Sequence, residues 1–103
     1  MLLYRKIDKV NRTTIPKWIV EHLNFKERQK VYLKFIYKGL ELSDQRISDY
    51  VMYLDKNNRI TIPQPYIDGT GWKYGDKLSF EVTRENTIVI YNETRKVPGK
   101  TAI

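Results

Sequence analysis

Residues 11–16 read NRTTIP and residues 58–63 read NRITIP, so one hexapeptide recurs after 47 residues with a single substitution. The match extends on both sides, because Asp8 and Lys9 align with Asp55 and Lys56, and further on Phe25 aligns with Trp72. No gap is needed from about residue 4 to residue 38. The sequence therefore predicts an internal repeat whose period is nearly half of the 103-residue chain.

Each repeat is predicted to contain two strands joined by a tight turn. Residues 2–10 and 50–56 are rich in β-branched and aromatic residues, which favours a strand. Asparagine follows at 11 and at 57–58, and asparagine tolerates the left-handed backbone that tight turns require. The second strand is short, because Pro16 and Pro63 cannot donate to a ladder.

A helix and a hairpin are predicted to complete each repeat. Pro16 suits the first turn of a helix, whereas Pro65, Gly69 and Gly71 predict that the second helix is shorter or absent. Alternating apolar residues then predict hairpins over 31–42 and 77–91, each with one buried face. Five aromatic residues occupy core-like positions and are expected to pack inside: Trp18, Phe25, Phe35, Trp72 and Phe80.

The chain carries an excess of positive charge. Nineteen Lys and Arg against twelve Asp and Glu give a net charge of +7, which fits a polyanion partner, although many small soluble proteins are basic without binding nucleic acid. The densest basic cluster surrounds the first turn, where only Asp8 is acidic. It consists of Arg5, Lys6, Lys9, Arg12 and Lys17.

The order of these elements resembles the swapped-hairpin AbrB/MazE/SpoVT family. The resemblance rests on YRKIDKVNRTTIP in the first repeat and on DKNNRITIP followed by WKYGDKLSFEV in the second. It implies a mainly β fold with short helices, in which two AbrB-like repeats form an intramolecular pseudo-dimer and close one swapped-hairpin β-barrel. The expected boundaries are 1–43 for repeat 1, 44–49 for a linker, 50–94 for repeat 2 and 95–103 for a short basic tail, with one core shared by both repeats.

The resemblance also implies a DNA-binding surface. AbrB-type regulators contact the duplex with arginines near the first strand and its turn, and Arg5 and Arg12 hold those positions in repeat 1. Arg59 matches Arg12, whereas Met52 stands in the place of Arg5. Together with the basic cluster, these matches predict seven DNA-binding residues: Arg5, Lys6, Lys9, Arg12, Lys17, Lys56 and Arg59.

The sequence lacks the residues that catalysis, metal binding or membrane insertion would require. There is no cysteine and only one histidine, His22, so we expect no catalytic residue, no metal site and no cofactor. No apolar stretch approaches the roughly 18–20 residues that span a bilayer, and the N-terminus lacks a signal-peptide core. We therefore expect a cytoplasmic protein that is neither an enzyme nor membrane-bound.

Two functions fit these observations. The first is a DNA-binding transcriptional regulator that contacts double-stranded DNA mainly through phosphates and reads groove shape. The alternative is a protein-interaction module on the same fold, either antitoxin-like or binding a host factor. A homodimer of pseudo-dimers and a separate protein partner are both compatible with the sequence.

Overall fold

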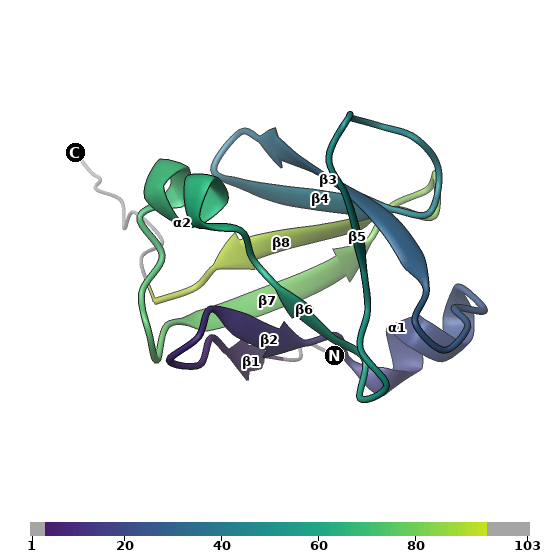
Figure 1. The fold of residues 1–103 in the computed structure, drawn as a ribbon, viewed down its shortest axis with the longest axis horizontal. Coiled ribbons are helices and arrows are strands. Elements are labelled where there is room, and N and C mark those ends of the chain that lie inside the picture. The colour runs from purple at the N-terminus through teal and green to yellow at the C-terminus, as the bar shows by residue number, and fades with distance from the viewer. Residues whose placement is uncertain (1–3, 95–103) are drawn as a thin grey trace.

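The structure is a computed structural model that describes residues 4–94, so the expected basic tail lies outside the described residues. It is mainly β, with two short helices, as predicted (Figure 1). The strands and helices are β1 (Tyr4–Lys6), β2 (Arg12–Thr14), α1 (Lys17–His22), β3 (Lys30–Ile36), β4 (Gly39–Ser43), β5 (Val51–Tyr53), β6 (Arg59–Thr61), α2 (Gln64–Thr70), β7 (Lys77–Val82) and β8 (Ile88–Asn92).

Six strands form one curled, half-barrel sheet. The strand at each end of this sheet pairs with a strand from the opposite half of the chain. The strand order is β1-β7-β8-β4-β3-β5, and all neighbours are antiparallel. Strand β1 therefore pairs with β7 of the second repeat, and β5 pairs with β3 of the first. The local hairpins β3–β4 and β7–β8 meet in the middle through β4 and β8.

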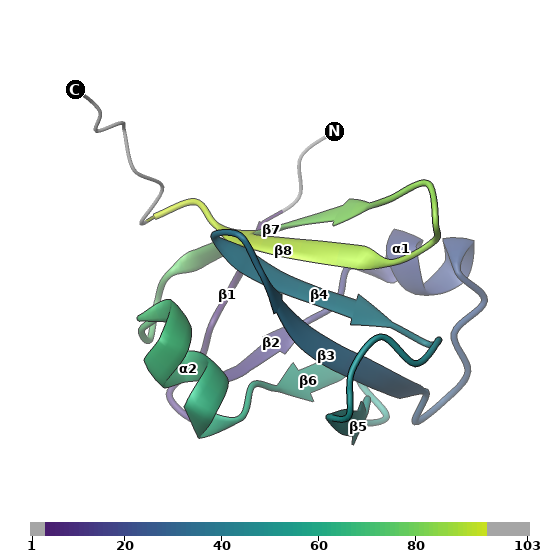
Figure 2. The same cartoon turned by 90° about the horizontal axis from the view of Figure 1, so that it is seen from above.

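The two remaining strands form a separate antiparallel ribbon, β2–β6, which contains the repeated hexapeptide. Thr13 lies opposite Ile60 at its centre, and both side chains are buried. The ribbon covers the inner face of the sheet, as Figures 1 and 2 show from two directions. Ile60 joins a single core cluster with Leu33 and Leu78 of the sheet.

The pairing registers are related by the 47-residue offset. Val51 faces Tyr32 across β5–β3, and Tyr4 faces Ser79 across β1–β7, which is the same pair shifted by one repeat. The ribbon repeats this relation, since Ile15 N–H donates to the Asn58 carbonyl at 2.9 Å and Ile62 N–H donates to the Asn11 carbonyl at 2.8 Å. The two halves thus have matching backbone pairings at these positions.

The second helix differs from the sequence prediction. Helix α2 has seven residues and α1 has six, so the expectation that the second helix is shorter or absent is wrong. Pro65 falls in the first turn, where a missing N–H costs no helical hydrogen bond. Gly71 lies just after the helix with φ of 73°, so it ends the helix with a left-handed residue.

Two of the five aromatic residues expected in the core lie at the surface. Trp18 on α1 is 43% exposed, and Phe35 at the end of β3 is 50% exposed. The alternation of apolar residues along β3 places Phe35 on the inner face of the sheet. That face ends beside α2, so the Phe35 side chain still reaches solvent. Trp72 and Phe80 are buried as predicted. Among residues 4–94, no helix is long and apolar enough to cross a membrane.

Candidate nucleic-acid interface

The turn between β1 and β2 is closed by one aspartate and one arginine. Asp8 Oδ1 accepts hydrogen bonds from the backbone N–H of Val10 (2.9 Å) and of Arg12 (2.8 Å). Arg12 Nε donates to the other carboxylate oxygen, Asp8 Oδ2, at 2.9 Å. Asn11 completes the turn with φ of 65°, a conformation that asparagine tolerates better than most residues. We call residues 8–12 turn 1.

The turn between β5 and β6, residues 55–59, has the same construction and is called turn 2. Asp55 Oδ1 accepts the backbone N–H of Asn57 (2.8 Å) and of Arg59 (2.9 Å), and Arg59 Nε donates to Asp55 Oδ2 at 2.8 Å. Asn58 takes φ of 60°. Both arginines are therefore held in fixed orientations by their own turns, which removes part of the entropy cost of placing a guanidinium against a ligand.

The ribbon brings Arg12 and Arg59 onto one surface. Because strand residues alternate between faces, the buried pair Thr13 and Ile60 places both arginines on the opposite, outer face. Arg12 lies opposite Thr61 and Arg59 opposite Thr14, so the two arginines are diagonal neighbours across the ribbon. We call this surface, with its two turns, the ribbon face.

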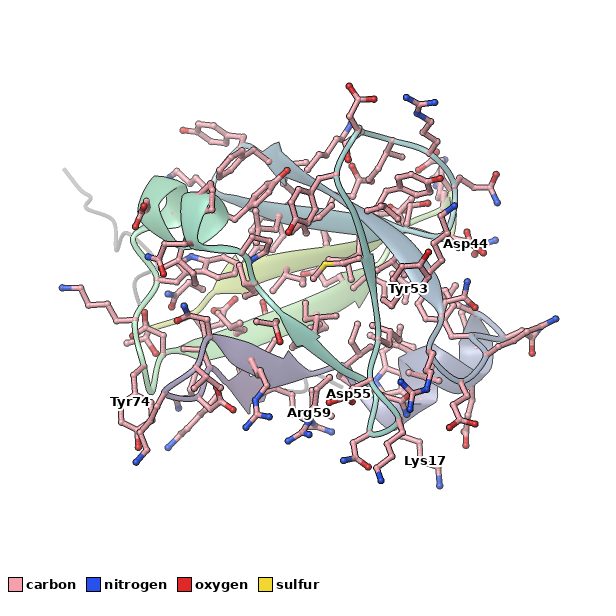
Figure 3. The ribbon with its side chains drawn as sticks, viewed as in Figure 1. Lys17, Asp44, Tyr53, Asp55, Arg59 and Tyr74 are labelled. Carbon is pink, nitrogen blue, oxygen red and sulfur yellow. The ribbon has the colours of Figure 1, made fainter. Side chains whose placement is uncertain are left out.

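Three of the predicted lysines lie at the ends of the ribbon face. Lys9 and Lys56 are exposed residues within turn 1 and turn 2. Lys17 belongs to repeat 1 but lies near turn 2. Ile15, two residues before Lys17, donates its backbone N–H to the carbonyl of Asn58 in turn 2. Figure 3 shows Lys17, Asp55 and Arg59 along the same edge of the molecule. The position related to Lys17 at the other end is Gln64, so the face carries one more lysine near turn 2.

The other two predicted residues, on β1, are not part of the ribbon. Lys6 is exposed and lies opposite Lys77, on the outer face of the sheet. Arg5 points to the inner side, opposite buried Leu78, and its Nη1 donates to the Tyr4 carbonyl at 3.0 Å. The related residue in repeat 2 is Met52, which packs against the core. The structure thus brings together Lys9, Arg12, Lys17, Lys56 and Arg59 along the ribbon. It leaves both Arg5 and Lys6 in the six-stranded sheet, outside that group.

Sequence reasoning missed the structural role of the two aspartates. Asp8 and Asp55 look in the sequence like repeated acids beside lysines, yet each fixes a turn and orients an arginine. The signal was available, because aspartate precedes arginine by four residues in both repeats, with asparagine just before the arginine. Within residues 4–94, no three His, Asp or Glu side chains gather as a metal-binding group.

The same contacts shift the pKa of both carboxyls. Burial raises the pKa of Asp8, but the hydrogen bonds from the Arg12 backbone and side chain, and from Val10, outweigh this effect and lower the pKa below its ordinary value. Asp55 behaves in the same way, with Arg59 and Asn57 as its partners. A carboxyl whose pKa is lower in the folded state stabilises the fold above its unfolded pKa, and that stabilisation is lost as pH falls through the folded pKa.

Replacing Asp8 and Asp55 with asparagine is expected to lower the free energy of unfolding at pH 7 by about 0.5–2 kcal/mol in total, since both ion pairs are partly exposed. The difference from wild type should shrink below about pH 4, where the unfolded carboxyls begin to protonate. Urea unfolding at pH 7 and pH 2.5 measures both. The matched control is Asp49→Asn, whose pair with Arg46 is largely exposed and should contribute nothing measurable. A difference that is unchanged at low pH would contradict the assigned role of the charge.

Comparisons of the chain with protein-family models, with curated proteins and with solved structures return no match.

Proposed function

We propose that the chain is an intramolecular pseudo-dimer of two AbrB-like swapped-hairpin repeats and that it binds double-stranded DNA through the ribbon face. The exchange of β1 and β5 between the halves supports the first part, because a single repeat would leave these strands without a partner. The observation that carries the second part is the pair of arginines, Arg12 and Arg59, which two identical turns hold on one outer face.

The proposed contacts with DNA phosphates depend on how the protein holds each basic side chain. The Nε of each arginine is occupied by an aspartate, so its terminal nitrogens are the groups that bind phosphate oxygens. Lys9 and Lys56 extend beyond the arginines on the turns and add phosphate contacts at the two ends of the face. Since phosphate contacts carry little sequence information, selectivity arises mainly from groove width and deformability.

The matching pairings of the two ribbon strands fit the local dyad of a DNA duplex. A protein with two-fold symmetry can place equivalent groups on both DNA strands, and a two-stranded ribbon is narrow enough for the major groove. Lys17 near turn 2 and Gln64 near turn 1 make the two ends unequal. The end near turn 2 therefore binds phosphate more strongly.

The proposal is that of a transcriptional regulator acting in the cytoplasm by binding, without a catalytic step or cofactor. The alternative, a protein-interaction module on the same fold, predicts a well-folded protein with no affinity for DNA. One measurement distinguishes the two proposals: the affinity of the protein for a DNA duplex as a function of salt concentration.

Fluorescence anisotropy with a labelled mixed-sequence duplex, over a series of salt concentrations, tests the proposal. If all five basic residues of the ribbon face contact phosphates, log K should fall against log salt with a slope of about −4.5. The variant Lys9→Gln/Lys56→Gln should flatten the slope by about 1.8, because it removes two contacts. Both lysines are exposed, so the fold should be unaffected.

The matched control is Lys30→Gln/Lys77→Gln. These two lysines are also related by the 47-residue repeat and are exposed, but they lie on β3 and β7, on the outer face of the sheet. The control removes the same charge and should leave the slope within about 0.5 of wild type, reflecting only long-range charge. Equal flattening by both variants would mean that general charge, and not the ribbon face, drives binding. No binding at low salt would favour the protein-interaction module.

A further inference from the structure

Two threonines lie between the arginines at the centre of the ribbon face. Because strand residues alternate between faces and the middle residue of each ribbon strand is buried, Thr14 and Thr61 share the outer face with the arginines. Thr61 lies opposite Arg12, and Thr14 lies opposite Arg59. Thr61 is exposed and Thr14 is half-buried. Both threonines therefore reach the outer surface of the ribbon.

The two ion pairs draw the arginine side chains away from this centre. Arg12 Nε donates to Asp8 Oδ2 at 2.9 Å, and Arg59 Nε donates to Asp55 Oδ2 at 2.8 Å. Each guanidinium is thus held beside its own turn, and the two turns lie at opposite ends of the ribbon. In Figure 3, Asp55 and Arg59 lie next to each other at one edge of the molecule. The short side chains of the two threonines therefore stay accessible between the guanidinium groups.

The hydroxyls of these two threonines are available to a ligand. Within residues 4–94, neither Thr14 Oγ1 nor Thr61 Oγ1 makes a hydrogen bond. Hydroxyls elsewhere in the described chain hold the fold together, and the threonines that do so are Thr70, Thr83, Thr87 and Thr94. Thr14 and Thr61 thus present both a methyl group and an unused hydroxyl on the face that carries the arginines.

The internal repeat places the same residue at both of these outward positions. Thr14 and Thr61 are related by the 47-residue offset, as are Thr13 and Ile60 just before them. At the buried position the two repeats differ in chemistry, since one side chain is polar and the other is apolar. On the outer face, each strand carries a threonine two residues after its arginine. The two strands therefore present the same two groups in the same order.

Threonine carries groups that match the edge of thymine in the major groove. That groove is about 12 Å wide and admits a two-stranded ribbon. Thymine presents its C5 methyl group and its O4 acceptor there, and a threonine offers a methyl group to the first and a hydroxyl donor to the second. With the basic side chains at the turns bound to phosphates, the threonines face the base edges between them.

We infer that Thr14 and Thr61 each contact a thymine in the major groove, so that the ribbon face recognises bases as well as groove shape. This inference rests on the proposed binding of duplex DNA. Diagonal neighbours across an antiparallel pair lie about 7–8 Å apart. Base pairs are stacked about 3.4 Å apart. The two contacted base pairs are therefore about two steps apart, with the thymines on opposite DNA strands because the ribbon strands are antiparallel.

Selection from duplexes randomised over about ten central base pairs, one helical turn, tests the inference with the full-length protein. Enriched duplexes are expected to share two A·T pairs about two steps apart. Each thymine of an enriched duplex is then replaced in turn with deoxyuridine, which removes only the C5 methyl group. The replacement should weaken binding about fourfold at each of the two contacted positions, the effect of one lost apolar contact, and should change little elsewhere.

Matched protein variants assign the methyl contacts to the two threonines. Thr14→Ser/Thr61→Ser removes only two methyl groups, so it should bind about 16-fold more weakly and no longer distinguish thymine from deoxyuridine. Thr14→Val/Thr61→Val keeps both methyl groups and should keep the distinction. The control Thr83→Ser removes a methyl group between β7 and β8 and should behave as wild type. None of these changes removes a charge, so the salt dependence of binding should stay that of wild type.

Circular dichroism should show that the serine variant keeps its strands, because serine is a weaker strand former than threonine. If that variant unfolds, the deoxyuridine replacements with the wild-type protein decide the question without it.

The outcomes separate this inference from the proposed function. Duplex binding at low salt without an enriched sequence would overturn the inference and leave phosphate binding by the ribbon face standing. An enriched duplex that accepts deoxyuridine at every thymine without loss would do the same, as would a folded serine variant that still distinguishes the two bases. A protein that binds no duplex at low salt would overturn both.

Discussion

Replacing Ile60 with alanine should lower the free energy of unfolding by about 2–5 kcal/mol, the usual cost of removing a large buried aliphatic side chain. Ile60 is fully buried at the centre of the ribbon, and it packs in the core shared by both repeats. Domains of this size are stable by only about 5–15 kcal/mol, so the change removes a large part of the total. Urea unfolding followed by circular dichroism measures it.

The opposite change at the neighbouring position is the matched control. Thr13 faces Ile60 across the ribbon and, among the described residues, its Oγ1 is a buried side-chain atom without a hydrogen-bond partner. Thr13→Val keeps the shape and removes the unsatisfied hydroxyl, so it should raise the free energy of unfolding by about 1 kcal/mol. A loss below about 1 kcal/mol for Ile60→Ala would mean that the ribbon contributes little to the core.

The double variant Arg12→Ala/Arg59→Ala should bind duplex DNA at least about 100-fold more weakly than wild type. A charge-assisted hydrogen bond contributes about 1.5–3 kcal/mol, and 1.4 kcal/mol is a factor of ten. The variant also leaves Asp8 and Asp55 without their ion-pair partners, so two carboxylates then repel phosphate. Fluorescence anisotropy at one low salt concentration measures the loss.

Conservative variants separate this effect from a loss of charge or of folding. Arg12→Lys/Arg59→Lys keeps the charge but lacks the planar fork that binds an aspartate and a phosphate together, so it should recover only part of the affinity. Circular dichroism should show that both double variants keep their strands. Affinity within threefold of wild type for the alanine variant would exclude the two arginines from the interface.

Much of the secondary structure was predictable because it depends on local patterns. The repeated asparagines take the left-handed turn conformation, and the alternating stretches become β3–β4 and β7–β8. The second helix was mispredicted because helix propensities do not show whether a proline or glycine lies inside a helix or at its end. Pro65 in the first turn and Gly71 just beyond the last are compatible with a helix, although both would break one in its interior.

The site was predictable only in part, because strand pairing decides which residues meet. No local pattern places Lys17 near turn 2, since that position depends on β2 pairing with β6. Alternation on β1 puts Arg5 and Lys6 on opposite faces, although the sequence groups them in one basic cluster. The stacking of Phe35 on Tyr66, with ring centroids 4.5 Å apart, was missed for a similar reason, since the two residues are 31 positions apart in the chain.

The most direct test of the central proposal is the change in backbone amide chemical shifts of the ¹⁵N-labelled protein as a short duplex is added. DNA binding through the ribbon face predicts the largest shifts in turn 1, turn 2 and strands β2 and β6. Amides of Lys30–Ile36 and Lys77–Val82, in strands that form the sheet, should change little. Shifts concentrated in β3 and β7 with unchanged turns would contradict the proposal, as would a spectrum that the duplex leaves unaltered.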